Sequence, residues 1–299
     1  MNLNKIINNS RTIQSMLGIS KLEFNNLLPM FELSLLESNK ARSVANLRKF
    51  GGGAKGKLDT VEKKLFFVLF YLKTYPTFDV LGAVIDFDKA NANKNILLLL
   101  SPLQKALGKK IVLPERKVSS LEELFDKFPE IKDVFVDGLE RPVKRPKNKK
   151  AQNKLYSGKK KNHARKSIVI TDEHKKILLI TPSKSARRHD KKLADKSSLF
   201  EHIPERITVW ADTGFQGILK QHKNTMIPSK RLKNQSFTLE QKQENKLISS
   251  FRVVVEHAIS AIKRYRSVSE KLRNHIANID DVFLNIASGL WNLHLQHTR

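Results

Sequence analysis

Asp133-Val134-Phe135-Val136-Asp137 has the alternating pattern of a β-strand that ends in an acidic side chain. Three other stretches have the same strand character, at 167–171, 177–181 and 207–212, and 224–228 is a weaker fifth candidate. Helical spacing occurs between and after these strands, at 189–200, 238–266 and 278–294. Five strands with interleaved helices predict an α/β fold.

The N-terminal third of the chain predicts helices only. Apolar residues recur at helical spacing from 13 to 28, and Gly18 with Ser20 supplies a helix stop and a new N-cap. Further helices are expected at 60–73, 78–85 and 90–100, with a tight turn at 86–88. This is the outline of a helix-turn-helix module, although any small three-helix domain gives the same outline.

Glycines mark a boundary within this helical third. Three consecutive glycines from residue 51 cannot hold a helix, and the stretch 51–57 lacks the Lys-Ser/Thr ending of a phosphate-binding loop. We therefore expect four parts: an N-terminal helical region at 1–50, a basic linker at 51–57, a helix-turn-helix DNA-binding region at 58–110 and an α/β domain at 131–296.

Positive charge is the strongest signal in the composition. The 299 residues include 56 Lys and Arg against 29 Asp and Glu, a formal net charge of +27. Residues 141–188 alone hold 17 basic and two acidic side chains, and 17 − 2 = +15 is over half of that total. Such a field attracts polyanions, so we expect a basic hairpin that follows a phosphate backbone. A solvated basic loop is the simpler alternative.

The sequence has no membrane or secretory features. No run approaches the roughly 18 to 20 consecutive apolar residues that a membrane-spanning helix needs, and residues 1–10 are polar. The chain has no cysteine, which excludes disulfides and thiolate zinc sites. We therefore expect a cytoplasmic, nucleoid-associated protein with no membrane partner.

Three carboxylates stand in unusual local contexts. Asp137 closes the first strand and is followed by Gly138, which lets the backbone turn, and Asp212 closes the fourth strand. Side chains at the carboxyl ends of strands in an open α/β sheet face the crevice where ligands bind. Glu256 lies inside a long helix among apolar residues, an unfavourable place for a charge unless it faces a site.

Grouped carboxylates suit the cleavage of a phosphodiester bond. Oxygen ligands from Asp and Glu hold one or two Mg²⁺ ions, which neutralise the transition state and activate a water. Each acid on its own has a simpler explanation: Asp-Gly and Asp-Thr-Gly are common turn sequences, and Glu256 can pair with Arg252 on the helix surface. An aspartic protease would need a second Asp-Thr-Gly, which the context of Asp137 does not repeat.

A series of motifs decides between these alternatives. In chain order they are Val-Asp-Gly-Leu-Glu-Arg-Pro at 136–142, Tyr-Ser-Gly-Lys-Lys-Lys-Asn-His at 156–163, His-Asp at 189–190, Ala-Asp-Thr-Gly-Phe-Gln-Gly at 211–217 and Arg-Val-Val-Val-Glu-His at 252–257. From about residue 10 to about residue 292, the chain resembles the transposases of the IS5 family of insertion sequences, whose DDE-type domain also occurs in Harbinger-like elements. It departs from them at Leu139, where a threonine is usual, and at 186–188, which lack a glycine and a serine.

The resemblance implies an RNase H-like catalytic domain at 131–296 and a role for each motif. Asp137, Asp212 and Glu256 would be the catalytic residues and the ligands of Mg²⁺, two ions in the usual arrangement, with Mn²⁺ able to substitute. The supporting residues would be Glu140, His189, Asp190 and Arg252, and the DNA-binding residues would be Lys159, Lys160, Lys161, His163, Arg165 and Lys263.

It also implies a function: a DNA transposase that binds the terminal inverted repeats of an insertion sequence and catalyses metal-dependent cleavage and strand transfer. Because transposition joins two DNA ends, the partners would be double-stranded repeat and target DNA, and the synaptic complex would contain a homodimer at the least. Two rivals remain, a catalytically inactive transposase-derived DNA-binding protein and a ribosome-associated basic protein that prefers structured RNA.

Overall fold

The computed structural model describes residues 3–45, 56–231 and 236–298, and the chain divides into two compact units. The helical unit is built from described residues within Met1–Leu113, Ile262–Glu270 and Ile276–Arg299. The sheet unit is built from those within Pro114–Ala261 and Lys271–His275. Apart from Gly56 and Lys57, the expected linker at 51–57 lies outside the described residues.

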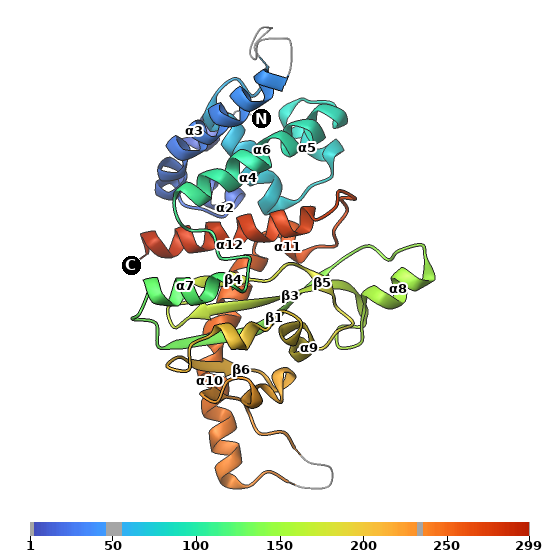
Figure 1. Ribbon diagram of the computed structural model, residues 1–299. Helices are drawn as coiled ribbons and strands as arrows, with labels where there is room; N and C mark the ends of the chain where they lie inside the picture. The colour runs from blue at the N-terminus through green and yellow to red at the C-terminus, as the bar shows by residue number, and fades with distance from the viewer. Residues whose placement is uncertain (1–2, 46–55, 232–235, 299) are drawn as a thin grey trace. The chain divides into compact units, whose positions relative to one another are not determined.

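Helices alone make up the helical unit. They are α1 (Leu3–Ile7), α2 (Ser10–Leu17), α3 (Lys21–Ala45), α4 (Val61–Thr74), α5 (Phe78–Ile85), α6 (Lys89–Lys109), α11 (Arg266–Ser269) and α12 (Ile279–His297) (Figure 1). The helices expected at 60–73, 78–85 and 90–100 are confirmed as α4, α5 and α6, of which α6 runs further than expected. α12 contacts α3 and α6; its apolar spacing predicted a helix but could not predict these partners.

The helix boundary predicted near residue 18 is confirmed. Gly18 ends α2 in the left-handed conformation with φ of 75°, which glycine adopts without strain. Ser20 then forms a reciprocal cap with Glu23: the Ser20 backbone N–H donates to Glu23 Oε2 at 2.6 Å, and the Glu23 N–H donates to Ser20 Oγ at 3.2 Å. This cap fixes where α3 begins.

A mixed β-sheet is the centre of the sheet unit. Its strands are β1 (Asp133–Pro142), β2 (Tyr156–Ser157), β3 (Asn162–Asp172), β4 (Ile177–Ile180), β5 (Lys184–Ser185), β6 (Thr208–Ala211) and β7 (Thr225–Met226). Their order is β2-β3-β1-β6-β7, with β4 and β5 also paired to β3. β1 runs antiparallel to β3 and parallel to β6, and β6 runs parallel to β7. The five predicted strands are all confirmed.

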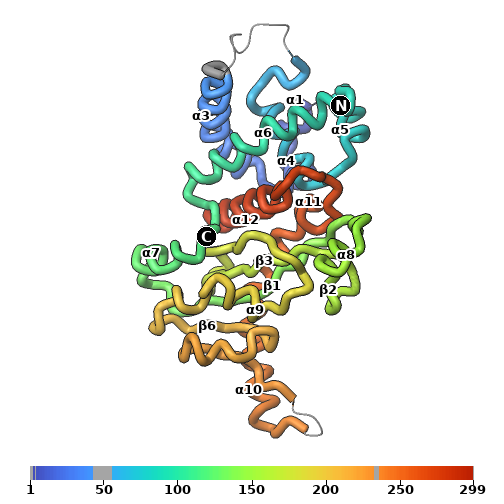
Figure 2. Tube along the Cα trace, turned by 45° about the vertical axis from the view of Figure 1, so that its right-hand side comes forward, coloured from blue at the N-terminus to red at the C-terminus, as the bar shows by residue number. Residues whose placement is uncertain are grey.

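Helices cover both faces of this sheet. They are α7 (Ser120–Lys127), α8 (Lys149–Leu155), α9 (Asp190–Asp195) and α10 (Leu239–Lys263), with short 3-10 turns at Leu199–His202, Thr213–Phe215 and Ile218–Lys220. α7 and α9 lie on one face, whereas α10 passes over the other (Figures 1 and 2). The helix expected at 189–200 is therefore shorter, with α9 followed by a 3-10 turn.

The alternation of side chains along β1 assigns each residue to a face. Val134 and Val136 belong to the buried apolar cluster that also includes Phe125 of α7 and Leu193 of α9. Phe135 points the other way, where it stacks on Trp210. Trp210 in turn stacks on Phe251 of α10, with ring centroids 4.7 Å apart. Asp137 has the same parity as Phe135 and therefore faces α10.

Among the described residues, no helix combines the length and the apolar character that crossing a membrane requires.

Candidate active site

Parallel pairing brings two of the candidate aspartates together. Phe135 of β1 is paired with Trp210 of β6, and Val136 with Ala211. The next residue in each segment is an aspartate, so Asp137 and Asp212 lie side by side where the pairing of β1 with β6 ends. β6 ends at Ala211, one residue before Asp212, where the sequence predicted the strand to end. The prediction that β1 ends at Asp137 is wrong, because this strand continues to Pro142 as the partner of β3.

Asp137 lies in a setting that disfavours its charge. Burial raises the pKa of Asp137 above its ordinary value near 3.8. The Gly138 backbone N–H donates to Asp137 Oδ1 at 2.7 Å and, with the Arg252 guanidinium, opposes this shift. The negative charges of Asp212 and Asp190 add to it. A cation placed against Asp137 would therefore be stabilised by neighbouring negative charge on two sides.

Asp212 has a better-compensated charge. Burial alone would raise the pKa of Asp212, but the Thr213 hydroxyl, which donates to its Oδ1 at 2.9 Å, together with Arg252 and Lys159 lowers the pKa overall. Arg252 thus acts on both aspartates, with its Nη2 3.9 Å from Asp137 Oδ2. In this structure the guanidinium supplies the positive charge that the pair of carboxylates requires.

A buried lysine joins two of the predicted supporting residues on the opposite face of β1. Lys166 Nζ lies 3.0 Å from Glu140 Oε1 and 3.0 Å from Asp190 Oδ1, and all three side chains are almost wholly buried. Burial alone would lower the pKa of Lys166, but the two carboxylates outweigh it and raise the pKa above its ordinary value. A buried ion triplet of this kind is sensitive to the loss of any member.

Two glycines make room for Asp190. A Cβ atom at Gly138 would lie 2.7 Å from Asp190 Oδ1, and one at Gly214 would lie 3.2 Å from Asp190 Oδ2. The expectation that Gly138 allows a turn is wrong: among the described glycines only Gly18 and Gly217 have positive φ, and Gly138 lies within β1. Its missing side chain, not its backbone freedom, is what the site uses.

Glu256 is placed differently from the two aspartates. It lies one turn after Arg252 on α10, and therefore on a neighbouring part of the helix surface. Its side chain is exposed, so the prediction that Glu256 is a buried charge is wrong. The neighbouring Val255 faces the core instead. Within the described residues, no three His, Asp or Glu side chains come close enough to hold a metal ion. The structure thus brings Asp137 and Asp212 together and leaves Glu256 apart.

The predicted DNA-binding residues on the basic hairpin fall into two groups. Lys159, Lys160 and Lys161 are exposed on the turn between β2 and β3, and Lys159 Nζ reaches to 4.0 Å from Asp212 Oδ2. His163 packs edge-on against Tyr156, and Arg165 donates to the Ser183 carbonyl at 2.9 Å. The lysines are therefore available to a ligand, whereas these two side chains also hold the hairpin together.

The structure also gives the positions of His189, Lys263 and Leu139. His189 is exposed directly before α9, beside Asp190. Lys263 is the last residue of α10 and belongs to the helical unit, whereas the two aspartates belong to the sheet unit. Its expected contact with DNA stays a prediction. Leu139, which replaces the usual threonine, is fully buried. It has the same parity as Asp137 along β1, so it packs beside the aspartate on the α10 face.

A cleft of about 700 Å³ opens beside these groups. Its lining includes the carboxylates of Asp212, Asp190 and Glu140 together with the cations Lys159, Lys166, Arg187 and Arg188. Lys166, Arg187 and Arg188 were not predicted from the sequence to belong to the site. The signal was available, because Lys166 has the same parity as the buried Ile168 and Ile170 and was thus an inward-facing lysine.

Comparison with known proteins agrees with this geometry. Residues 136–292, just over half of the chain, match the family described as DDE superfamily endonuclease, and the chain belongs to that family. It is also similar to a protein named "Probable transposase for insertion sequence element IS702" from Microchaete diplosiphon. The two are 27% identical over 291 residues, which cover 96% of this chain and 95% of the relative. The chain thus resembles an insertion-sequence transposase over nearly its whole length. No solved structure matches it.

The glycine at 138 yields a test of how Asp190 is held. Gly138→Ala should lower the free energy of unfolding by about 1 to 3 kcal/mol, because the added methyl group displaces the Asp190 carboxylate from Lys166. In an Asp190→Ala background, the same change should be neutral or stabilising by about 0.5 to 1 kcal/mol, since alanine restricts an extended backbone more than glycine does. Urea unfolding of all four proteins measures this. Equal losses in both backgrounds would contradict the assignment.

Proposed function

We propose that the protein is a DNA transposase, which binds the terminal inverted repeats of its element and cuts and joins DNA with the help of Mg²⁺. The observation that best supports it is the position of Asp137 and Asp212, side by side where the parallel pairing of β1 with β6 ends, within a matched endonuclease family. The sheet order and strand directions fit an RNase H-like fold.

The carboxylates present suit a divalent metal. Magnesium is commonly held by one or two carboxylates and completes its coordination with water and substrate phosphate oxygens. Asp137 and Asp212 supply such a pair. Arg252 interacts electrostatically with both carboxylates, as a bound cation would. Glu256, one turn from Arg252, is the proposed third ligand. When bound, the metal would activate the attacking water and neutralise charge on the phosphate.

The remaining residues of the site would position the reacting groups. Lys166 and Asp190 would hold the two aspartate segments at a fixed separation, because the Asp190 carboxylate fills the space beside both Gly138 and Gly214. Lys159, exposed and near Asp212, is suited to bind a substrate phosphate next to the metal. The buried triplet of Lys166, Glu140 and Asp190 would keep the site rigid, and the exposed Lys159 would attract the charged substrate.

Recognition and assembly complete the proposal. Helices α4, α5 and α6 have the order of a helix-turn-helix module and are the proposed reader of the terminal repeat. Joining two ends calls for two copies of the chain.

The alternative is a transposase-derived protein that binds the repeat without cutting it; retention of both adjacent aspartates favours the active enzyme.

Cleavage of a labelled terminal repeat tests the proposal directly. With Mg²⁺, the native protein should cut at the repeat end, and Asp212→Asn should reduce the rate by at least about 100-fold because one anionic metal ligand is lost. Glu205→Gln, an exposed acid elsewhere in the sheet unit, is the matched control and should cut normally. Unchanged cleavage by Asp212→Asn would overturn the metal-site assignment. Tight repeat binding with no cutting by the native protein would support the inactive alternative.

The raised pKa of Asp137 predicts how metal binding depends on pH. Affinity for Mn²⁺ should fall as the pH is lowered from about 7 to about 4, because Asp137 takes up a proton at a higher pH than an ordinary aspartate. Asp212, whose pKa is lowered, takes up its proton at a lower pH than an ordinary aspartate does. Electron paramagnetic resonance measures the free Mn²⁺. A pH dependence that is just as strong in Asp137→Asn would contradict this assignment.

A further inference from the structure

A second cleft, of about 320 Å³, lies between α8 and the start of α9. Its lining consists of Lys150, Lys154, Ser185, Arg187, Arg188, His189 and Lys192. Five of these seven side chains are permanent cations, and the described lining residues include no carboxylate. None of the five cations forms an ion pair with another described residue. Like charges gathered in this way repel one another unless an anion lies between them.

The local structure holds this cleft open in one arrangement. Lys150 and Lys154 are four residues apart on α8 and so lie on one side of the helix. The Asn148 side chain caps the start of α8, and the Ser185 hydroxyl donates to the Lys154 carbonyl at its end. The Arg145 side chain also donates to Gln152 of α8 at 3.0 Å. α8 is thus fixed at both ends against the hairpin that carries it.

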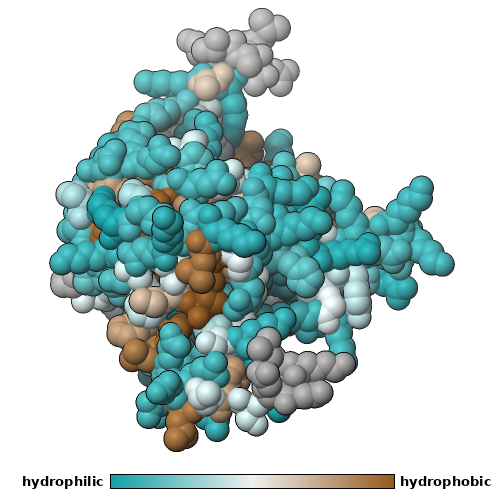
Figure 3. All heavy atoms as spheres, turned by 60° about the horizontal axis from the view of Figure 1, so that its bottom comes forward, coloured by the Kyte–Doolittle hydropathy of each residue, from teal (hydrophilic) through white to brown (hydrophobic). Residues whose placement is uncertain are grey.

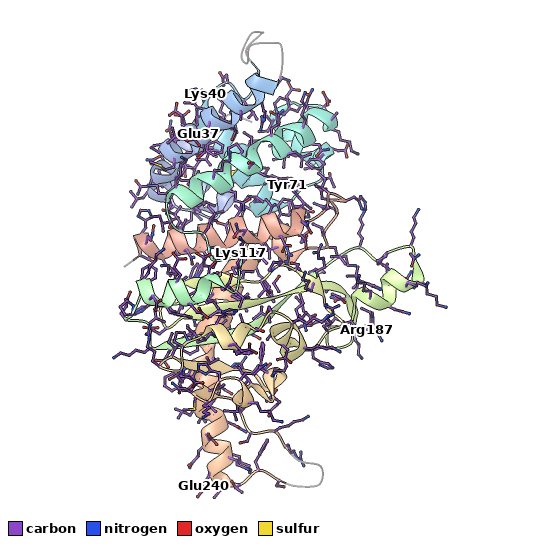
Figure 4. All side chains as sticks on the ribbon, viewed as in Figure 1. Glu37, Lys40, Tyr71, Lys117, Arg187 and Glu240 are labelled. Carbon is purple, nitrogen blue, oxygen red and sulfur yellow. The ribbon has the colours of Figure 1, made fainter. Side chains whose placement is uncertain are left out.

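The second cleft continues the first. Arg187, Arg188 and His189 line both, so a ligand leaving Asp212 passes these side chains before it reaches α8. Figure 4 shows Arg187 on the α8 side of α9. The projection on the right of Figure 3, where α8 lies in Figure 1, is almost wholly hydrophilic, which suits an extended charged ligand and not an apolar partner.

We infer that this second cleft, lined by Lys150, Lys154, Arg187, Arg188 and Lys192, binds backbone phosphates of the DNA next to the scissile phosphate. This inference rests on the proposed function and adds to it a path for the substrate. The ligand chemistry is a row of phosphodiesters, each of which carries one negative charge. Three sources share that chemistry: the element's own end, the donor DNA flanking it, and the target DNA after strand transfer.

Two double variants separate a defined path from a general attraction. Lys150→Glu with Lys154→Glu reverses two charges that line the cleft. Lys147→Glu with Lys149→Glu reverses two exposed charges on the same hairpin that do not line it. Both pairs change the net charge by the same amount, and all four side chains are exposed, so folding should be retained. Thermal unfolding checks this.

Affinity is measured by fluorescence anisotropy over a series of salt concentrations with three DNAs: a repeat ending at the scissile phosphate, a repeat with flanking DNA, and a strand-transfer product. The cleft variant should bind at least one of them about ten-fold or more weakly than the control variant does, with a salt slope smaller by about 2. The DNA that shows the selective loss identifies the source.

Two outcomes overturn the inference in distinguishable ways. If the cleft variant and the control variant lose the same affinity for all three DNAs, the cleft has no special role, while cleavage by the native protein leaves the proposed function intact. If the native protein binds none of the three DNAs above its affinity for unrelated duplex, the proposed function fails and this inference fails with it.

Discussion

The parallel pairing of β1 with β6 is the constraint on which the rest of the site depends. Its register, Phe135 with Trp210 and Val136 with Ala211, makes Asp137 and Asp212 neighbours at the end of the pair. Phe135 and Trp210 stack, and Phe251 of α10 covers Trp210, so aromatic packing fixes the level of the two strands. A slip of one residue would send one aspartate to the opposite face.

Two adjacent carboxylates in a half-buried place need compensation, and the surrounding residues supply it from both faces of the sheet. Arg252 approaches from α10 on the side of the aspartates. From the other side, Lys166 holds Asp190 against the glycines that follow each aspartate. The cationic clefts beside the site extend this pattern outward, so negative charge at the centre is surrounded by positive charge at the rim.

The sequence predicted the strands, the main helices and the adjacency of two aspartates, since period-two alternation and strand ends are local features. It did not predict the true role of Gly138, because a missing side chain is explained only by the neighbour that fills the space, Asp190. The prediction of a buried Glu256 failed for a similar reason. Apolar neighbours along a helix do not show which side of the helix packs against the rest of the protein. The burial of Lys166 could have been predicted, because it lies on the same face of β3 as the buried Ile168 and Ile170.

We propose that Asp137 and Asp212 jointly hold a divalent cation. Anomalous diffraction from crystals of the protein with repeat DNA and Mn²⁺ tests it most directly. We expect a peak within about 2.3 Å of a carboxylate oxygen of each aspartate, with the Arg252 guanidinium displaced from Asp137. Manganese peaks that lie only elsewhere, with Arg252 still beside Asp137, would overturn this assignment.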